Sequence, residues 1–265
     1  MTVWFIRKRF DRPCSLVLVP FIAVIAAAGA LQSDATGLSE EDRNAISRLL
    51  GEGVLGPTLP ADPISEKTAL IPLAPATRIF RLSSGPDAGT TETDILRAGV
   101  QEGADAIWQY AAGRRSVYNL RRTSDGSIVI PTEQDLVLGA IIRYDPPQPL
   151  IIHGIRPGEQ RSLSIAVEVS YPDDPARVAH SGLFSVSYTY LGRYRITVPA
   201  GTYPAALIKW QYHGEVGLAG FKGSQYWFFA DGLGPIAVID EQHISALVLY
   251  KKDTKYGKVL QGDAR

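Results

Sequence analysis

The sequence predicts a mainly β protein, a curved antiparallel sheet or incomplete β-barrel, with a short N-terminal helix and an N-terminal signal segment. From residue 105 onward, many short runs are rich in Val, Ile, Tyr, Phe and Trp and are separated by Gly, Pro, Asp and Asn. No helical segments alternate with these runs, which argues against a parallel sheet. Short strands at this spacing indicate a sheet that curls or closes into a sandwich or barrel.

The first 30 residues have the pattern of a secretory signal peptide. Four basic residues between Arg7 and Arg12 precede an uncharged apolar stretch, and the small residues 28–30 suit a cleavage site. We therefore expect cleavage after Ala30 and a periplasmic or secreted bacterial protein. The alternative is an uncleaved N-terminal membrane anchor. Two features disfavour it: the apolar stretch contains Pro20, and its length is near the lower limit of about 17 residues for a membrane span.

Cysteine usage and charge exclude several classes of protein. Cys14 is the only cysteine and precedes the apolar stretch, so the mature chain has no disulfide, thiolate nucleophile or cysteine metal site, and no lipid attachment site is expected. Residues 1–30 hold four of the 27 basic and one of the 27 acidic residues, which leaves 23 against 26 and a net charge of −3. Nucleic acid is therefore not an expected partner, and no membrane span is expected after cleavage.

The mature chain has three predicted parts. Residues 31–76 combine a short helix with a proline-rich linker or strap, residues 77–255 form the β-rich domain, and residues 256–265 form a C-terminal tail. This length allows a sizeable hydrophobic core. A hydrophobic fraction of 45% also argues against wholesale disorder.

The helix is expected over residues 38–51. Ser39 is a suitable N-cap, acidic residues fill the first turn, and an apolar stripe runs to Gly51, which ends the helix. The five prolines of residues 52–76 then prevent a regular helix and discourage a central strand. The segment is interpreted as a linker or as a strap that lies on the β domain.

The clearest strand is FSVSYTY, residues 184–190. Phe184, Val186, Tyr188 and Tyr190 share one face, and serine and threonine side chains share the other. This alternation is typical of a half-buried antiparallel strand.

Two glycine-containing segments are interpreted as turns. In residues 198–201, VPAG, the proline and glycine suit a hairpin with a bulge at Gly201, so backbone geometry alone explains them. Leu207 and Ile208 are adjacent and both apolar, which indicates a strand covered on both faces. The glycine-rich segment 214–224 lacks the spacing of a phosphate-binding loop and is interpreted as a flexible hairpin loop.

Three motifs together resemble a bacterial envelope family, the domain of unknown function thirty-one-oh-eight. They are RYDPPQPLIIHGIRPGE (143–159), YRITVPAGTYPAALIKW (194–210) and QYWFFADGLGPIAVID (225–240), and the resemblance covers about residues 105–250. It implies a secreted or periplasmic protein with a curved antiparallel sheet or incomplete barrel, akin to bacterial lipoprotein carriers. It implies no catalytic residue, because the motifs consist mainly of turn and core residues.

The histidines give no indication of a catalytic or metal site. The spacing of the four histidines does not match a metal-binding motif; they are His153, His180, His213 and His243. No metal or cofactor is therefore expected. The alternative is that histidines on different strands meet in the folded protein. His180 and Ser181 are strand neighbours that point to opposite faces, which argues against a Ser–His pair.

Three acidic positions are candidates for catalysis. The pairs Asp173-Asp174 and Asp240-Glu241 supply adjacent carboxylates, although such pairs more often lie in solvated turns. Glu168 interrupts an apolar run and would be a site candidate if it faced inward. The alternative interpretation is that Glu168 lies on the solvent-exposed face of a half-buried strand.

Aromatic residues provide the candidate binding site. They are concentrated in the predicted strands, and most are expected to form the core. A curved sheet could also use part of the set to line an apolar groove. The candidate ligand-binding residues are Trp108, Tyr188, Tyr190, Trp210 and Trp227.

The leading functional hypothesis is a non-enzymatic periplasmic binding module. Its expected partner is a hydrophobic small molecule, a lipid or another envelope protein. The alternatives are an envelope hydrolase that uses carboxylates the sequence does not assign, and a purely structural interaction protein with an exposed sheet edge. The hypothesis rests on the analogy between a curved sheet and a binding groove.

Overall fold

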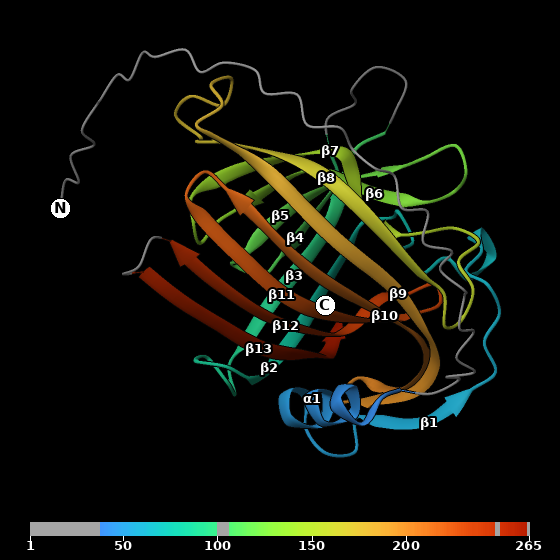
Figure 1. Cartoon of the computed structure of the whole chain (residues 1–265). Coiled ribbons are helices and arrows are strands. Elements are labelled where there is room, and N and C mark those ends of the chain that lie inside the picture. The colour runs from blue at the N-terminus through green and yellow to red at the C-terminus, as the bar shows by residue number, and fades with distance from the viewer. Residues whose placement is uncertain (1–37, 100–105, 247–249, 264–265) are drawn as a thin grey trace, which may run out of the picture. The chain divides into compact units, whose positions relative to one another are not determined.

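The computed structural model describes residues 38–99, 106–246 and 250–263 (Figure 1). The predicted signal peptide, residues 1–30, and Cys14 lie outside these ranges. Within these ranges, no helical segment has the length and hydropathy of a membrane span. Their elements are α1 (Glu40–Leu50), β1 (Leu55–Leu59), the 3-10 turn η1 (Glu66–Thr68), β2 (Ala76–Ser84), β3 (Thr91–Ala98), β4 (Trp108–Ala112), β5 (Ser116–Arg122), β6 (Ile128–Asp135), β7 (Ala140–Ile151), β8 (Gln160–Ser170), β9 (His180–Val198), β10 (Gly201–Val216), β11 (Ala219–Ala230), β12 (Gly234–Ala246) and β13 (Tyr250–Asp263).

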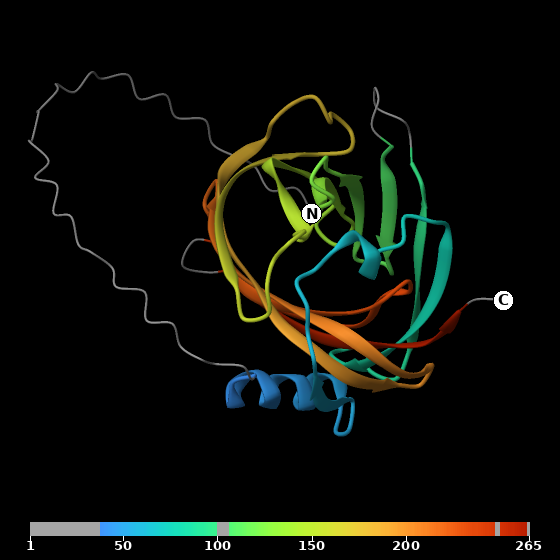
Figure 2. The ribbon, with the colours of Figure 1, turned by 90° about the vertical axis from the view of Figure 1, so that its right-hand side faces the viewer.

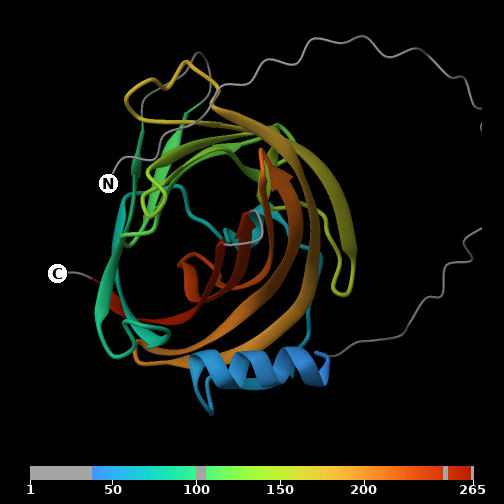
Figure 3. The same cartoon turned by 60° about the vertical axis from the view of Figure 1, so that its left-hand side comes forward.

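Strands β2 to β13 form a closed antiparallel barrel (Figures 2 and 3). Each strand pairs with the next along the chain, and β13 pairs with β2 to complete a ring of twelve strands. The mainly β, antiparallel prediction is confirmed, but the sheet is a complete barrel and not an incomplete one. Residues 257–263, expected as part of a tail, form the segment of β13 that pairs with β2 and closes the ring.

Strand β1 lies outside this ring. It pairs with the second half of β9, where Leu55 is opposite Ile196. It falls within the segment that the sequence assigns to a proline-rich linker, and it contains Pro57. An edge strand tolerates proline because one side of its backbone needs no partner.

A bulge lets β9 bury apolar side chains on two different surfaces. Tyr188 and Tyr190 belong to the core inside the barrel, as the alternation predicts. The register then shifts at Gly192, opposite Leu207 and Ile208. Before the bulge, even-numbered side chains of β9 point into the barrel. Beyond it, even-numbered side chains point outward, and Tyr194 packs on the outside of the barrel. A β-bulge changes the facing of every following residue in this way.

The two predicted turns differ from the expectation in detail. Residues 198–201 form a two-residue hairpin in which Val198 pairs directly with Gly201, so the bulge expected at Gly201 lies at Gly192 instead. In segment 214–224, paired strands continue to Val216 and resume at Ala219. The segment forms the expected hairpin, but its loop consists of Gly217 and Leu218 alone, because Gly214, Gly220 and Gly223 lie within paired strands.

Helix α1 covers the outer face of the barrel (Figure 3). Its stripe of Ile46, Leu49 and Leu50 is buried against β10 to β13 and β2. Leu207 packs in this outer cluster, and its neighbour Ile208 packs inside the barrel. The prediction that this strand is covered on both faces is confirmed.

Asp42 joins α1 to the barrel through a buried polar cluster. Its carboxylate accepts hydrogen bonds from Lys209 Nζ at 2.6 Å, the Tyr226 hydroxyl at 2.7 Å and the Ser39 hydroxyl at 2.7 Å. Burial alone would raise the pKa of Asp42, but these donors outweigh it, and the pKa lies below its ordinary value. The ionised form therefore stabilises the fold above about pH 4, and this contribution is lost as the pH falls further.

We expect Asp42→Ala to lower the free energy of unfolding by about 2–3 kcal/mol, because it leaves the largely buried Lys209 ammonium without its ion-pair partner. Urea denaturation at pH 7 measures this loss. Glu41→Ala, an exposed position in the same helical turn, is the control and should change stability by about 0.5 kcal/mol or less. Equal effects of the two variants would contradict the role of the cluster.

The proline-rich segment docks as a strap across one end of the barrel (Figure 2). Ile64, Leu70 and Ile71 are at most 4% exposed and pack into the interior core. Ile64 also exchanges two backbone hydrogen bonds with the β7–β8 connection, to the carbonyl of Ile155 at 3.0 Å and from the N–H of Gly154 at 2.7 Å. This end of the barrel is therefore plugged.

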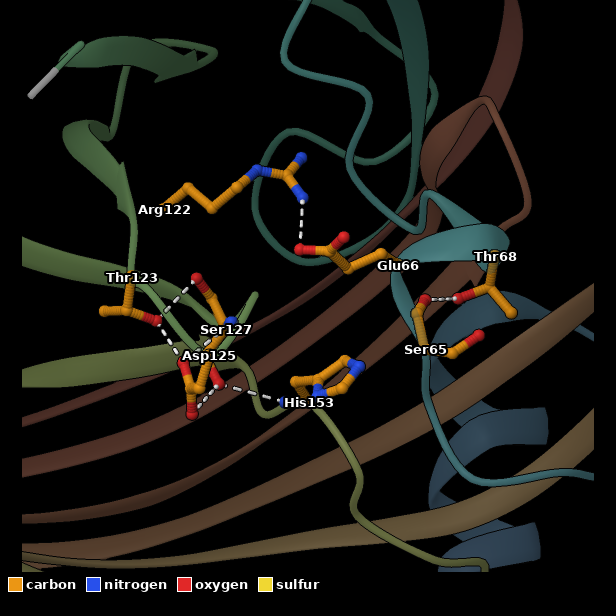
Figure 4. A network of polar contacts seen from close by, with 8 residues as sticks. All are labelled: Ser65, Glu66, Thr68, Arg122, Thr123, Asp125, Ser127 and His153. Atoms are coloured by element: carbon orange, nitrogen blue, oxygen red, sulfur yellow. Dashed lines mark hydrogen bonds and ion pairs between the residues drawn. The ribbon is translucent and has the colours of Figure 1, made fainter.

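Polar contacts order the loops beside the strap (Figure 4). Glu66 of η1 forms an ion pair with Arg122 at 3.7 Å. Asp125 accepts the backbone N–H of Ser127 at 3.1 Å, and the Ser127 hydroxyl accepts the backbone N–H of His153 at 3.0 Å. Because the His153 contact uses the backbone, it does not pair a histidine base with a serine nucleophile.

Candidate ligand-binding cavity

The opposite end of the barrel contains a cavity of about 570 Å³. Its lining includes residues of the β2–β3, β4–β5 and β6–β7 hairpins, which an up-and-down barrel places at one end. The strap contacts the β7–β8 and β11–β12 connections, which lie at the other end. Trp210 lines the cavity and packs on Trp227 of the interior core, with 5.7 Å between ring centroids.

Glu133 of β6 is a carboxylate of this lining that is held by hydroxyl groups. The Ser116 hydroxyl donates to Oε1 at 2.6 Å, and the Tyr144 hydroxyl donates to Oε2 at 2.8 Å. Burial raises the pKa of Glu133 to about 7, although both hydrogen bonds act in the opposite direction. The side chain is therefore poised to change its charge near neutral pH.

Asp240 of β12 is a second inward carboxylate. Burial raises its pKa to about 6, opposed by a hydrogen bond from Gln225 at 3.3 Å and by the positive charge of Arg115. Arg115 lies with its guanidinium 3.9 Å from the centre of the Tyr256 ring. Its position over this ring places a fixed positive charge on the Asp240 side of the cavity.

Aromatic rings make up much of the remaining wall. Phe184 lies 5.5 Å from both Tyr212 and Phe221, measured between ring centroids. Burial raises the pKa of the lining tyrosines well above the ordinary value, so their hydroxyls stay protonated; these are Tyr118, Tyr144, Tyr212 and Tyr256. The Trp210 indole N–H is buried and has no hydrogen-bond partner within the described residues.

The five predicted ligand-binding aromatics occupy different environments. Trp210 lines the cavity, and Tyr190 lines a smaller one of about 230 Å³ beside the strap. Tyr188 and Trp227 lie in the packed interior, where the Tyr188 hydroxyl donates to the Leu150 carbonyl at 3.1 Å. Trp108 is partly buried against the same core. The structure brings only Trp210 to the 570 Å³ cavity, and ligand contact by any of the five stays a prediction.

The candidate acids separate according to strand geometry. Glu168 is exposed, so the interpretation as a residue on the wet face is confirmed. Asp173 and Asp174 are exposed in the β8–β9 connection. Asp240 points into the cavity, and its neighbour Glu241 points outward to Arg48 of α1 at 3.1 Å.

The histidines do not form a metal site. In residues 38–99, 106–246 and 250–263, no group of three or more His, Cys, Asp or Glu side chains is arranged to hold a metal ion. His180 and His213 are exposed. His243 pairs with Asp253 of the adjacent strand β13.

Sequence reasoning missed Glu133 because a bulge changes the facing of β6. Ile128 and Ile130 face the interior, and simple alternation would then turn Glu133 outward. Against β5, however, β6 contains one extra residue between Val129 and Thr132, which restores Glu133 to the inner face. Pro131 within this stretch was the available signal, since proline in a strand marks an edge or a bulge.

Two solved structures are similar to this chain. A protein from Bacteroides fragilis, described as exported and as having a YmcC-like fold, is 12% identical over 80% of this chain and 99% of its own, with a TM-score of 0.42. A protein from Parabacteroides distasonis, described as a lipoprotein, is 10% identical over 78% of this chain and 100% of its own, with a TM-score of 0.39. No family model and no curated protein matches the chain, so the family resemblance drawn from its three motifs stays a prediction.

Proposed function

We propose that this chain is a binding protein that holds a small amphipathic molecule inside the barrel. The observation that carries the proposal is a cavity of about 570 Å³ in a barrel whose other end is plugged by the strap. Ligand sites in proteins typically measure about 300–1,000 Å³ and combine aromatic walls with a few fixed polar groups. The pattern of residues 1–30 supports the placement of this binding protein in the bacterial periplasm or outside the cell.

The lining supports binding of a molecule that is only partly apolar. Trp210, Phe184 and Phe221 offer apolar contact. Glu133 and Asp240 place carboxylates in the same space. A wholly apolar chain would leave these polar groups dehydrated without new partners, at a cost of about 1–3 kcal/mol each.

Blocking the cavity tests the proposal. Gln242 lines the cavity, and we expect Gln242→Trp to fill part of it and to weaken the binding of the uncharged dye N-phenyl-1-naphthylamine by about tenfold or more. Dye fluorescence, titrated at pH 8, is the measurement. Gln134→Trp, an exposed position on β6, is the matched control and should bind as the wild type does. Equal binding by both variants, or no binding by the wild type, would contradict the proposal.

A second candidate function is hydrolysis of an envelope glycan or ester, favoured by two inward carboxylates with raised pKa values. The hydrogen bonds of Glu133 favour binding instead, because each of its oxygens already accepts a hydroxyl. Catalysis would be supported by turnover of nitrophenyl esters or glycosides that Glu133→Gln and Asp240→Asn both abolish. Absence of turnover across such a panel would count against it.

A further inference from the structure

We infer that the ligand is an organic cation, an ammonium or amine group joined to an apolar body. Its charge would lie beside Glu133 and Asp240, and its apolar body against Trp210 and the neighbouring phenylalanines. This inference rests on the proposed binding function and specifies the chemical class of the ligand. Three features of the cavity carry it: the balance of charges, the lack of a countercharge at Glu133 and the aromatic wall.

The charged groups around the cavity are predominantly acidic. Two of the charged lining residues are paired away from the cavity, Asp253 with His243 and Lys255 with the outward Glu241. The remaining ionised lining carries a net negative charge, with four carboxylates against two basic side chains; these are Asp87, Glu133, Asp135 and Asp240 against Arg115 and Lys252. A cavity lined mainly by one sign of charge concentrates ligands of the opposite sign. An anionic lipid or carboxylate would meet repulsion here.

Glu133 has no cationic partner in the part of the chain that the structure describes. Within the described residues, no lysine or arginine forms an ion pair with it, and its two hydrogen bonds come from the neutral hydroxyls of Ser116 and Tyr144. A buried carboxylate is stabilised when an opposite charge comes close. A bound ammonium would supply that charge, and the two hydroxyls hold the carboxylate in place to receive it.

The surrounding rings form the kind of wall that binds organic cations. The face of an aromatic ring attracts a cation within about 6 Å of its centre, and cages of such rings recognise quaternary ammonium groups. The Tyr256 face already holds the Arg115 guanidinium at 3.9 Å. Tyr118, Tyr144 and Tyr212 line the same cavity as the two carboxylates. Aromatic and ionic attraction therefore act on one region of the ligand.

Three probes of similar shape and different charge test the inference. They are phenyltrimethylammonium, its neutral isostere tert-butylbenzene, and benzenesulfonate, titrated by calorimetry and tryptophan fluorescence at pH 8. We expect the cation to bind about tenfold or more tightly than the neutral probe, and the anion to bind weakest. If the neutral probe or the anion binds as well as the cation, the inference fails and the binding function stands. If no probe binds, and N-phenyl-1-naphthylamine does not bind either, both fail.

Variants assign the cation to this site. Glu133→Gln and Asp240→Asn should each weaken phenyltrimethylammonium binding by about fivefold or more and leave tert-butylbenzene unaffected. Glu241→Gln changes the adjacent outward carboxylate on β12 and is the matched control, expected to leave both affinities unchanged. Loss of tert-butylbenzene binding in the Glu133 or Asp240 variant would show a damaged cavity and overturn the charge assignment.

The cation affinity should also fall as the pH is lowered from 8 to 5. Glu133, with a pKa of about 7, and Asp240, with a pKa of about 6, then take up protons, and the quaternary ammonium has no proton to lose. The lining tyrosines stay neutral over this range because burial raises each pKa. A pH-independent affinity would overturn the inference. Apart from the paired Asp253 and Lys255, the other charged and tyrosine side chains that line the cavity with the two carboxylates are Asp87, Arg115, Tyr118, Asp135, Tyr144, Tyr212, Lys252 and Tyr256.

Discussion

Replacing Lys258 with methionine should lower the free energy of unfolding by about 3–5 kcal/mol, the cost of removing one partner from a buried ion pair. Lys258 is 1% exposed, and its ammonium lies 2.8 Å from carboxylate oxygens of both Glu92 and Asp94. The Tyr110 hydroxyl donates to the same Asp94 carboxylate. Methionine fills a similar volume but leaves two carboxylates in the barrel wall without a countercharge, so burial then acts against folding.

Urea denaturation at pH 7 measures this loss, and the same strand provides a control. Lys255 of β13 pairs with Glu241 at 3.3 Å, but its side chain is 59% exposed. Because exposed ion pairs contribute about 0–1 kcal/mol, Lys255→Met should be nearly neutral. If Lys258→Met is equally mild, the buried cluster does not stabilise the barrel. If Lys258→Met does not fold at all, the double variant Lys258→Met with Asp94→Asn should recover part of the loss.

The local structure of the chain was largely predictable from its sequence, because periodicity and capping act over a few residues. The alternation of residues 184–190 assigned the inner face of β9 correctly, and Ser39 caps α1 as expected. Closure of the ring depends instead on pairing between β13 and β2, which are far apart in the sequence. No local pattern in residues 256–265 indicates that partner, so they were predicted as a tail.

The candidate site was harder to predict than the fold, because bulges decide which side chains face inward. The bulge at Gly192 and the extra residue in β6 each reverse the alternation along a strand. Glu133 was therefore missed, and the aromatic residues chosen as ligand contacts lie mostly in the packed core. Asp240 was identified only as one of two adjacent acids, because neighbouring strand residues point to opposite faces and no local pattern decides which of the pair faces inward.

Glu133→Gln should stabilise the protein at pH 8 and leave its stability at pH 4.5 almost unchanged. In the folded state, burial raises the pKa of Glu133 from its ordinary value of 4.5 to about 7. The folded state therefore holds a proton that the unfolded chain has released, and stability falls as the pH rises from about 4.5 to 7 and then levels off. The full cost would be about 3 kcal/mol, and because water in the cavity screens the charge we expect about 1–3 kcal/mol.

Glutamine removes this cost because it stays neutral, and its amide can still bond to the hydroxyls of Ser116 and Tyr144. Urea denaturation of the wild type and the variant between pH 4.5 and 8 gives the difference in unfolding free energy at each pH. This difference should grow as the pH rises across the range. The unfolding free energy of the variant itself should still depend weakly on pH, because burial also raises the pKa of Asp240, to about 6. Glu168→Gln, which replaces an exposed carboxylate on β8, is the control and should change stability at pH 8 by about 0.5 kcal/mol or less. A difference that stays constant with pH for Glu133→Gln would mean that the pKa of Glu133 is the same in the folded and unfolded states. The cavity would then be too well hydrated to keep the carboxylate protonated near neutral pH.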